Sequence, residues 1–322
     1  MTRSRLPRVL LVGAGAMGSN HGRVLAESER CALVAVADPA ERRGRGLAER
    51  FGAEWMPEVG DLSDVDAVVV AATTDQHRRI ALEVLAHDVP LFVEKPLCTS
   101  PTGSREIVDT ALRRGVPLMC GFVERFNPAV IEALARLESP SAVHMQRHSI
   151  YSPRMRAGVA WDLLVHDVDL ALRLFGDVAP DVVHASVEYH SSEAERNGED
   201  VAEAVLEFSG ARMAVLSASR VASRRARRMI VSEGDRVVVA DLLNPSVAVY
   251  RDCHIVERTD CRGRGEPLVV QLNRFIDILD GKADVRAEAC SILPSHEAVA
   301  AILDSAAGRA ETGARLSLNP PM

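Results

Sequence analysis

Through residues 8–122, short apolar runs alternate with amphipathic stretches. The apolar runs are nearly continuous and lie at 8–13, 31–38, 65–73, 89–94 and 116–122. Helical patterns separate them, for example at 75–87 and 101–114. Strands that are apolar on both faces are typical of a parallel sheet with helices on each side. The alternation therefore predicts consecutive βαβ units, and with them a doubly wound Rossmann sheet.

After residue 128 the pattern changes to strands in which polar and apolar residues alternate, at 181–190, 201–208 and 211–219. This period of two indicates antiparallel strands with one wetter face. Apolar helical segments lie at 160–175, 268–280 and about 295–307. We therefore predict an α/β chain with a dinucleotide-binding Rossmann domain at 1–122. A C-terminal α+β domain at 123–322, with a large, mostly antiparallel open sheet, is expected to serve substrate binding and oligomerisation.

The composition narrows the class of protein. At 322 residues the chain exceeds the size at which one core keeps growing, which agrees with two domains. Its net charge of −7 gives no overall attraction to nucleic acid or to an anionic membrane, so neither is expected as a partner. The six cysteines are scattered, and we interpret them as reduced thiols and expect no metal site. Since no stretch reaches the ~18 apolar residues of a membrane span, a cytoplasmic protein is expected.

The loop Gly13-Ala14-Gly15-Ala16-Met17-Gly18 follows an apolar strand and opens a helical stretch. In this context G-x-G-x-x-G is the fingerprint of a dinucleotide site. The first glycine allows a tight turn, the second lets the backbone approach the pyrophosphate, and the third permits close helix–strand packing. The helix N-terminus then supplies N–H donors to the phosphates. The alternative is a tight strand–helix turn that binds no ligand.

Asp38 ends the second apolar run, 20 residues after Gly18. A carboxylate at this point binds the ribose 2′-hydroxyl of NAD and repels the 2′-phosphate of NADP. Arg42 and Arg43 follow closely and offer positive charge to a 2′-phosphate. We therefore predict NAD as the cofactor, with NADP as the alternative that these arginines leave open.

Further motifs lie at Glu94-Lys95-Pro96, after the fourth apolar run, and at 72–77 (ATTDQH), 125–128 (RFNP) and 162–167 (DLLVHD). In their order and spacing, the chain resembles the Gfo/Idh/MocA oxidoreductase family over nearly its whole length. The resemblance implies that the cofactor is contacted by Thr73, Thr74, His77, Glu94, Lys95 and Arg125, with the alternative that Glu94 positions Lys95. It also implies that Asn127 lies near the substrate and that the Lys95–Pro96 peptide bond is cis.

Lys95 follows a parallel strand, at the edge where ligands bind in open α/β sheets. Its ammonium can bind a substrate hydroxyl and stabilise the oxygen as negative charge develops. Asp162 and His166 are spaced i,i+4, which places them on one helix face, and the resemblance puts both beside the reacting carbinol. We predict these three residues as catalytic and substrate-binding groups. Whether Lys95 or His166 transfers the proton stays open at the level of sequence.

Residues 124–130 and 154–162 resemble a subgroup of nucleotide-sugar 3-dehydrogenases. There an arginine-rich loop precedes the catalytic aspartate; here Arg154 and Arg156 are displaced by one residue, and Trp161 replaces an aliphatic residue. Two arginines can hold a phosphate or carboxylate of the substrate, or they are solvated loop charges. The cluster 224–228 (RRARR) is interpreted as a solvated or subunit-interface sheet edge, because alternation in a strand sends its side chains to opposite faces.

Together these features predict an NAD(P)-dependent oxidoreductase. It is expected to transfer a hydride between nicotinamide and a secondary alcohol or ketone of a sugar, a nucleotide sugar or a cyclitol, with the 3-position of a UDP-sugar favoured. An imine or C=C reductase of the same family is one alternative, and a dinucleotide-binding regulator without turnover is another. A homodimer or homotetramer is expected by analogy with relatives, since free sheet faces and edges need cover.

Overall fold

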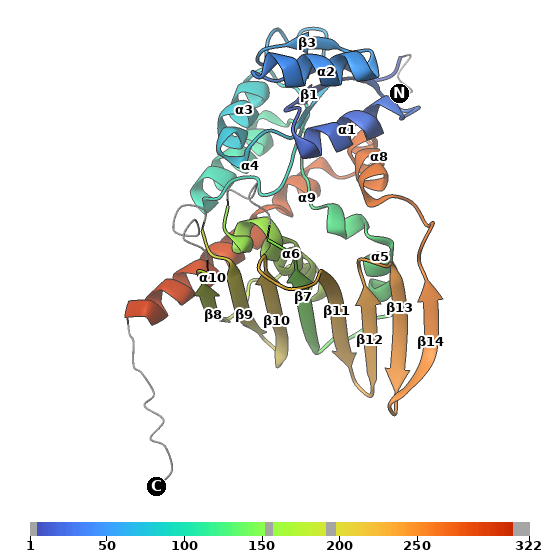
Figure 1. Cartoon of the computed structure of the whole chain (residues 1–322), viewed down its shortest axis with the longest axis vertical. Coiled ribbons are helices and arrows are strands. Elements are labelled where there is room, and N and C mark those ends of the chain that lie inside the picture. The colour runs from blue at the N-terminus through green and yellow to red at the C-terminus, as the bar shows by residue number, and fades with distance from the viewer. Residues whose placement is uncertain (1–4, 152–156, 191–197, 312–322) are drawn as a thin grey trace.

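The computed structural model of the chain describes residues 5–151, 157–190 and 198–311. The upper half of the molecule in Figure 1 contains a six-stranded sheet in the order β3-β2-β1-β4-β5-β6. Its strands are β1 (Arg8–Val12), β2 (Ala32–Ala37), β3 (Glu54–Met56), β4 (Ala67–Val70), β5 (Leu91–Val93) and β6 (Leu118–Cys120). All neighbours pair in parallel, and the strand order is that of a doubly wound Rossmann sheet.

Helices cover both faces of this sheet (Figure 1). They are α1 (Ala16–Ala26), α2 (Glu41–Phe51), α3 (Thr74–Ala86) and α4 (Pro101–Arg114). Along β1, Leu11 packs in the core that includes α1 and α2, whereas Leu10 packs in the core that includes α3 and α4. Burial on both faces is the reason that these strands are continuously apolar, so the predicted Rossmann sheet is confirmed.

Strand β3 is the part of this sheet that the sequence pattern missed. It has three residues, and the first is a glutamate. Its position comes from parallel pairing with β2 at the edge of the sheet. A strand of three residues is too short to show a pattern of alternating polar and apolar residues. It is therefore recognised only by its pairing with the neighbouring strand β2.

The second half contains an eight-stranded sheet in the order β14-β13-β12-β11-β7-β10-β9-β8. Its strands are β7 (Ala142–His148), β8 (Val182–Glu188), β9 (Val201–Phe208), β10 (Arg212–Ser219), β11 (Ala226–Glu233), β12 (Arg236–Asp241), β13 (Ser246–Arg251) and β14 (His254–Asp260). Every pair of neighbours is antiparallel except β7 and β10, which run in parallel. The predicted large, mostly antiparallel open sheet is therefore confirmed.

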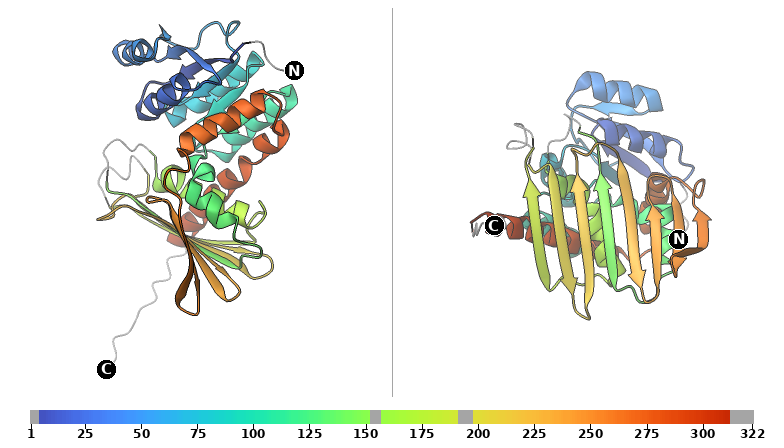
Figure 2. Two further views of the ribbon diagram at one scale, coloured as in Figure 1. Left: turned by 90° about the vertical axis from the view of Figure 1, so that its right-hand side faces the viewer. Right: turned by 60° about the horizontal axis from the view of Figure 1, so that its bottom comes forward.

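Helices cover only one face of the second sheet. They are α5 (Pro128–Leu134), α6 (Val165–Leu174) and α10 (Leu293–Glu311), and no described helix lies on the other face (Figure 2). Strand β11 lies inside the sheet, so the interpretation of 224–228 as a sheet edge is wrong. Alternation in the strand does separate its arginines: Arg227 bonds Glu124 on the covered side, and Arg228 is exposed.

The last part of the chain returns to the Rossmann sheet. Helix α8 (Pro267–Leu279) packs against α1 (Figure 1). The ring of Phe275 contacts that of Phe92 in β5, with centroids 5.8 Å apart. The short helix α9 (Val285–Cys290) contacts β6 and α4. A domain division after residue 122 stays a prediction, and α8 shares the core of the first sheet whichever division is used. Among the described helices, none has the length and apolar character needed to span a bilayer.

Candidate active site

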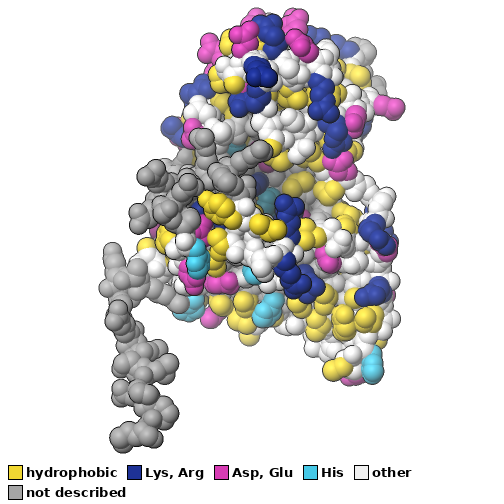
Figure 3. Space-filling view, viewed as in Figure 1, with side chains coloured by type: hydrophobic (Ala, Val, Ile, Leu, Met, Phe, Trp, Pro, Cys, Tyr) yellow, Lys and Arg dark blue, Asp and Glu magenta, His cyan; other side chains and the backbone are white. Residues whose placement is uncertain are grey.

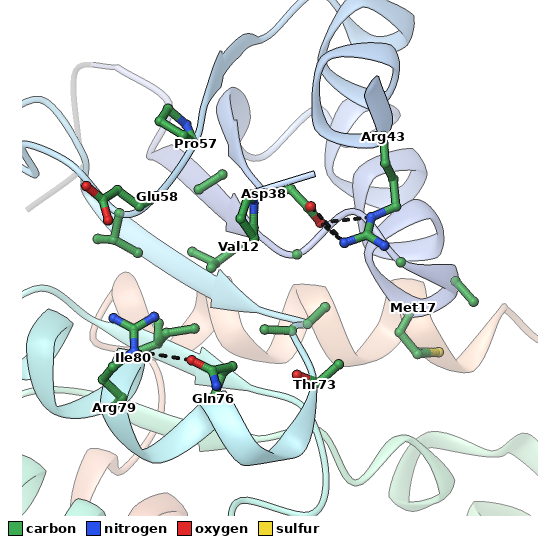
Figure 4. Close-up of a pocket in the computed structure, with 18 of the residues that line it drawn as sticks. Val12, Met17, Asp38, Arg43, Pro57, Glu58, Thr73, Gln76, Arg79 and Ile80 are labelled. Atoms are coloured by element: carbon green, nitrogen blue, oxygen red, sulfur yellow. Dashed lines mark hydrogen bonds and ion pairs between the residues drawn. The ribbon is translucent and has the colours of Figure 1, made fainter. Parts of the chain in front are cut away.

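A cavity of about 610 Å³ lies at the ends of β1, β2 and β4. The glycine loop, the residues after β2 and the start of α3 line it, and it reaches Asp162 in the second half of the chain. Figure 4 shows Met17, Asp38 and Thr73 around this space. Because ligands of open α/β sheets bind at the carboxyl ends of the strands, the cavity is the candidate cofactor site.

The glycine loop has the backbone that a dinucleotide site requires. Gly13 has a φ of +101°, and a Cβ on Gly18 would lie 1.9 Å from the carbonyl oxygen of Gly13. Gly15 precedes α1 without a capping side chain, and no described atom lies within 4 Å of the place of its Cβ. The first N–H groups of α1 are thus available to an anion in the cavity. The loop fits the pyrophosphate of a dinucleotide.

Asp38 is a buried carboxylate beside this loop. Its carboxylate oxygens accept hydrogen bonds from the backbone N–H groups of Ala14 (2.7 Å) and Ala40 (2.9 Å). The guanidinium of Arg43 also donates to both carboxylate oxygens (Figure 4). Burial alone raises the pKa of Asp38, but Arg43 and the two backbone donors outweigh it, so the pKa lies below its usual range. Asp38 is therefore a fixed anion at the cavity, with Arg43 already bound to it.

Thr73, Thr74 and His77 follow β4 and begin α3. Thr73 lines the cavity and precedes the helix, of which Thr74 is the first residue. His77 is buried and turned toward the neighbouring loop, with Nδ1 3.0 Å from the carbonyl oxygen of Pro96 and Nε2 3.1 Å from that of Ala72. The structure therefore brings Thr73 to the cofactor cavity and His77 to the loop that carries Lys95.

The Glu94-Lys95-Pro96 loop follows β5, and the Lys95–Pro96 peptide bond is cis, as predicted. Glu94 is buried, and its Oε1 lies 2.7 Å from Nε2 of His21. Lys95 Nζ donates to the carbonyl oxygen (2.6 Å) and to Oδ1 (2.9 Å) of Asp162. The Lys95 side chain is 18% exposed, so its ammonium is sheltered and still accessible. Two predicted site residues from opposite halves of the chain are thus in direct contact.

Asp162 lies in a π-helical turn, η2 (Ala160–Leu164), which runs directly into α6. The sequence predicted an ordinary helical face here, and a π turn is a rare element that is frequent at functional sites. The beginning of the turn is held by buried Glu199, whose Oε1 accepts a hydrogen bond from the N–H of Ala160 (2.7 Å). Gly158 permits this contact, since a Cβ there would lie 2.1 Å from Glu199 Oε2.

His166 stands in the first turn of α6 and is only 7% exposed. Within the described residues, its Nδ1 has no hydrogen-bond partner. Burial, followed by the positive charges of Lys95, Arg147 and Arg227, holds the pKa of His166 well below its usual value. The imidazole is therefore uncharged at neutral pH, which is the form that accepts a proton.

A buried charge cluster next to His166 was missed at the level of sequence. Arg147 of β7, 1% exposed, donates to Oδ1 of Asp167 and to Oε1 of Glu124, both at 2.7 Å. Glu124 lies in the short 3₁₀ helix η1 (Val123–Phe126). One feature of the sequence pointed to this cluster: Arg147 occupies an inward position of an alternating strand, where the other inward residues are apolar.

Arg125 and Asn127, which were predicted to lie near the cofactor and the substrate, make bonds within the protein. Arg125 donates to both carboxylate oxygens of Asp169, at 2.8 and 2.5 Å. Asn127 caps α5 by accepting a hydrogen bond from the N–H of Ala129 (3.0 Å). Neither residue is among the described residues that line the cavity, and a role of either one in ligand binding stays a prediction. The predicted phosphate-binding arginines of segment 152–156 fall outside the described residues.

The first half of the chain is a Rossmann domain with a cavity at its glycine loop, and the second half supplies a carboxylate to the same cavity. This combination is typical of a class of NAD-binding oxidoreductases. Residues 7–122 match the family model described as "Oxidoreductase family, NAD-binding Rossmann fold", and residues 129–237 match the GFO/IDH/MocA C-terminal domain. The chain belongs to the Gfo/Idh/MocA oxidoreductase family, as its motifs indicated.

Related proteins include two kinds of dehydrogenase. Inositol 2-dehydrogenase of Acidothermus cellulolyticus is 37% identical over 54% of this chain and 55% of its own length. UDP-N-acetylglucosamine 3-dehydrogenase of Acidithiobacillus ferrooxidans is 28% identical over 76% of each protein. The chain thus spans little more than half of the first relative and about three quarters of the second.

Solved structures agree with the fold over nearly the whole chain. The structure of UDP-N-acetylglucosamine 3-dehydrogenase from Acidithiobacillus ferrooxidans matches with a TM-score of 0.85 and 24% identity, covering 94% of this chain and 98% of that one. GenD2 from gentamicin A biosynthesis, solved in complex with NAD, matches with a TM-score of 0.79 and 26% identity, covering 95% of each chain.

Proposed function

We propose that this protein is an NAD-dependent oxidoreductase that acts on a secondary alcohol of a sugar, nucleotide sugar or cyclitol, or on the matching ketone. The observation that carries the proposal is the bond between Lys95 and Asp162, because Asp162 also lines the dinucleotide cavity. Neutral His166, whose pKa is lowered by burial and by the nearby ammonium of Lys95, completes the group. A cation, a carboxylate and a neutral base together suit proton transfer at a carbinol.

Each of the three side chains has a distinct role in this proposal. Lys95 binds the reacting oxygen through its ammonium and stabilises the negative charge that develops there. His166 accepts the hydroxyl proton during oxidation and returns it during reduction. Asp162 holds the ammonium of Lys95 in place by accepting its hydrogen bond. Bound NAD supplies the redox chemistry, as hydride acceptor or donor.

The residues that hold the cofactor come from the first half of the chain. The pyrophosphate binds at the N-terminus of α1, over Gly15 and Ala16, and Asp38 binds the adenosine ribose. We favour NAD over NADP because Asp38 is an ionised carboxylate at the cavity, and Arg43, which could otherwise bind a 2′-phosphate, is already bound to this carboxylate.

The names of the relatives support a polyhydroxylated ring as the substrate, since they include an inositol 2-dehydrogenase and a UDP-N-acetylglucosamine 3-dehydrogenase. We place the 3-position of a UDP-sugar first, because the match to the UDP-sugar enzyme extends over 76% of this chain, against 54% for the inositol enzyme. A cyclitol is the second candidate.

The test is reduction of NAD⁺, followed by absorbance at the reduced-nicotinamide band, with UDP-sugars, free sugars and inositols as separate substrates. Lys95→Ala is expected to abolish turnover. The matched control is Lys282→Ala, since Lys282 is the other lysine of the chain and its side chain is 63% exposed. A Lys95→Ala protein with wild-type turnover would disprove the assignment.

We also propose that the protein is a cytoplasmic homo-oligomer, a dimer or tetramer that forms through the open face of the second sheet. A row of side chains crosses this face in register, consisting of Val205, Val215, His144, Ile230 and Val239. A mainly apolar row on an uncovered sheet suits pairing with a second copy. On the face of the molecule in Figure 3, both acidic and basic side chains lie over the Rossmann half.

A further inference from the structure

The loop that presents Lys95 is bonded to three buried histidines from three different helices. His21 lies in α1, His77 in α3 and His296 in α10, and their exposed fractions are 4%, 1% and 0%. Helices α1 and α3 cover the first sheet, whereas α10 lies beside the second sheet (Figure 1). We propose that His21, His77 and His296 are positioning residues that fix Lys95 at the reaction centre. The inference deepens the proposed function and rests on it for the role of Lys95.

The contacts follow the loop residue by residue. His21 Nε2 lies 2.7 Å from Glu94 Oε1, and Glu94 Oε2 accepts a hydrogen bond from the backbone N–H of Lys95 (3.1 Å). Gly121 packs on the other side of Glu94, because a Cβ there would lie 2.7 Å from Glu94 Oε2. The carboxylate is thus held between α1 and the end of β6, and it transmits this position to the Lys95 backbone.

The other two histidines bind the residues after Lys95. His77 Nδ1 lies 3.0 Å from the carbonyl oxygen of Pro96. His296 Nε2 accepts a hydrogen bond from the N–H of Leu97 (2.9 Å), and its Nδ1 lies 2.9 Å from the carbonyl oxygen of Ile292. The backbone on both sides of Lys95 is therefore fixed by a buried side chain.

His296 is the histidine that also contacts the other side of the reaction centre. Its ring lies 5.8 Å, centroid to centroid, from that of Trp161, the residue before Asp162. Burial lowers the pKa of His296 to about 4, so the ring is neutral, with Nδ1 as donor and Nε2 as acceptor. One side chain thus touches both the Lys95 loop and the π turn that carries Asp162, and it sets their relative position.

Two features of the chain make a direct test possible. Lys95 and Lys282 are its only lysines, so lysine labelled with carbon-13 and nitrogen-15 gives resonances from these two positions alone. Lys282 is paired with Asp280 on the surface and serves as an internal reference. The Lys95 resonances report its position whether or not a substrate is known.

The variants are His296→Leu, which leaves the N–H of Leu97 without an acceptor, and His296→Gln, whose amide oxygen can replace Nε2. Val299→Ala, at a fully buried position of the same helix, is the control for a loss of packing alone. We expect His296→Leu to move the Lys95 resonances and leave those of Lys282 unchanged. We also expect kcat to fall about 100-fold with little change in the KM for NAD, as for a displaced catalytic group. His296→Gln should restore both, and His21→Leu and His77→Leu should act in the same direction as His296→Leu.

A folded His296→Leu protein with wild-type Lys95 resonances would overturn the proposal. So would an equal loss of kcat in Val299→Ala. If the wild-type protein turns over none of the polyols, the proposed function fails, and the Lys95 resonances still decide whether the histidines position this residue.

Discussion

Two buried residues of the candidate site, Asp38 and His166, differ in their charge at neutral pH. Asp38 keeps its negative charge although it is buried, because Arg43 and two backbone N–H groups bind the carboxylate. His166 loses its positive charge, because burial and neighbouring cations oppose protonation. The partners available to each group decide the outcome, and both outcomes can be measured.

The pH dependence of oxidation distinguishes the two candidate bases. If His166 accepts the proton, it must be neutral, so activity is lost as the pH falls through its lowered pKa. We therefore expect the acid limb of kcat/KM to lie below the ordinary histidine value of about 6.5. If Lys95 were the base, replacing His166 would leave the acid limb of this profile in place. The measurement is kcat/KM for the alcohol across pH.

The histidine variant is the control for this profile. His166→Gln is expected to lower kcat by about 10² to 10⁴, as for the loss of a general base, and to remove the acid limb. Lys282→Ala should leave the profile as in the wild type. An acid limb that persists in His166→Gln would assign the titration to another group.

Asp38→Asn tests cofactor choice at the same scale. The amide oxygen can still accept from a backbone N–H, but the charge is gone and Arg43 is released. Repulsion between like charges at close range costs several kcal/mol, and about 1.4 kcal/mol is tenfold. We expect the ratio of kcat/KM for NADP to that for NAD to rise by at least about tenfold. The double variant Asp38→Asn/Arg43→Gln should lose most of this gain, and an unchanged ratio in the single variant would contradict the assignment.

At the scale of elements, α8 stabilises a sheet that lies far from it in the sequence. Phe275, 1% exposed, packs in the same core as Phe92 and the residues of α1. We expect Phe275→Ala to lower the free energy of unfolding by about 3 to 5 kcal/mol, as for other buried aromatic residues. The measurement is urea denaturation of the whole chain.

The control for this prediction is Ile131→Ala on α5, where the isoleucine is 50% exposed. Its effect should stay within about 0.5 kcal/mol, since surface substitutions cost little. Equal losses in the two variants would show that α8 contributes no more to stability than an exposed position does.

At the scale of the whole molecule, the open face of the second sheet is the expected contact between copies. Ile230 belongs to the row that crosses this face and lies between His144 and Val239. We expect Ile230→Lys to shift the protein from an oligomer to a monomer of 34.8 kDa, because it buries a charge at the contact. Light scattering after size exclusion gives the mass. Val256→Lys, at a position 59% exposed on the edge strand β14, should leave the mass unchanged, and an unchanged mass in Ile230→Lys would place the contact elsewhere.

Local patterns of the amino-acid sequence determine much of this protein. Continuous apolar runs with helices between them require a covered parallel sheet, and the spacing from Gly13 to Asp38 places a dinucleotide at its edge. Period-2 alternation likewise indicates the antiparallel strands of the second half. These features are local, since each lies within a short continuous stretch of the chain. The resemblance to a known family added Lys95, Asp162 and His166.

Tertiary structure alone decided which distant groups meet. Lys95 and Asp162 are 67 residues apart, and Leu97 and His296 are 199 residues apart, yet each pair shares a hydrogen bond. Burial of Arg147 required partners from η1 and α6, and the use of Arg125 and Asn127 in structural bonds required Asp169 and the start of α5. Periodicity shows which face of a strand or helix is buried. The residue that contacts this face depends on how whole elements pack. A buried polar group needs a hydrogen-bond partner, and the tertiary structure determines which residue serves as that partner.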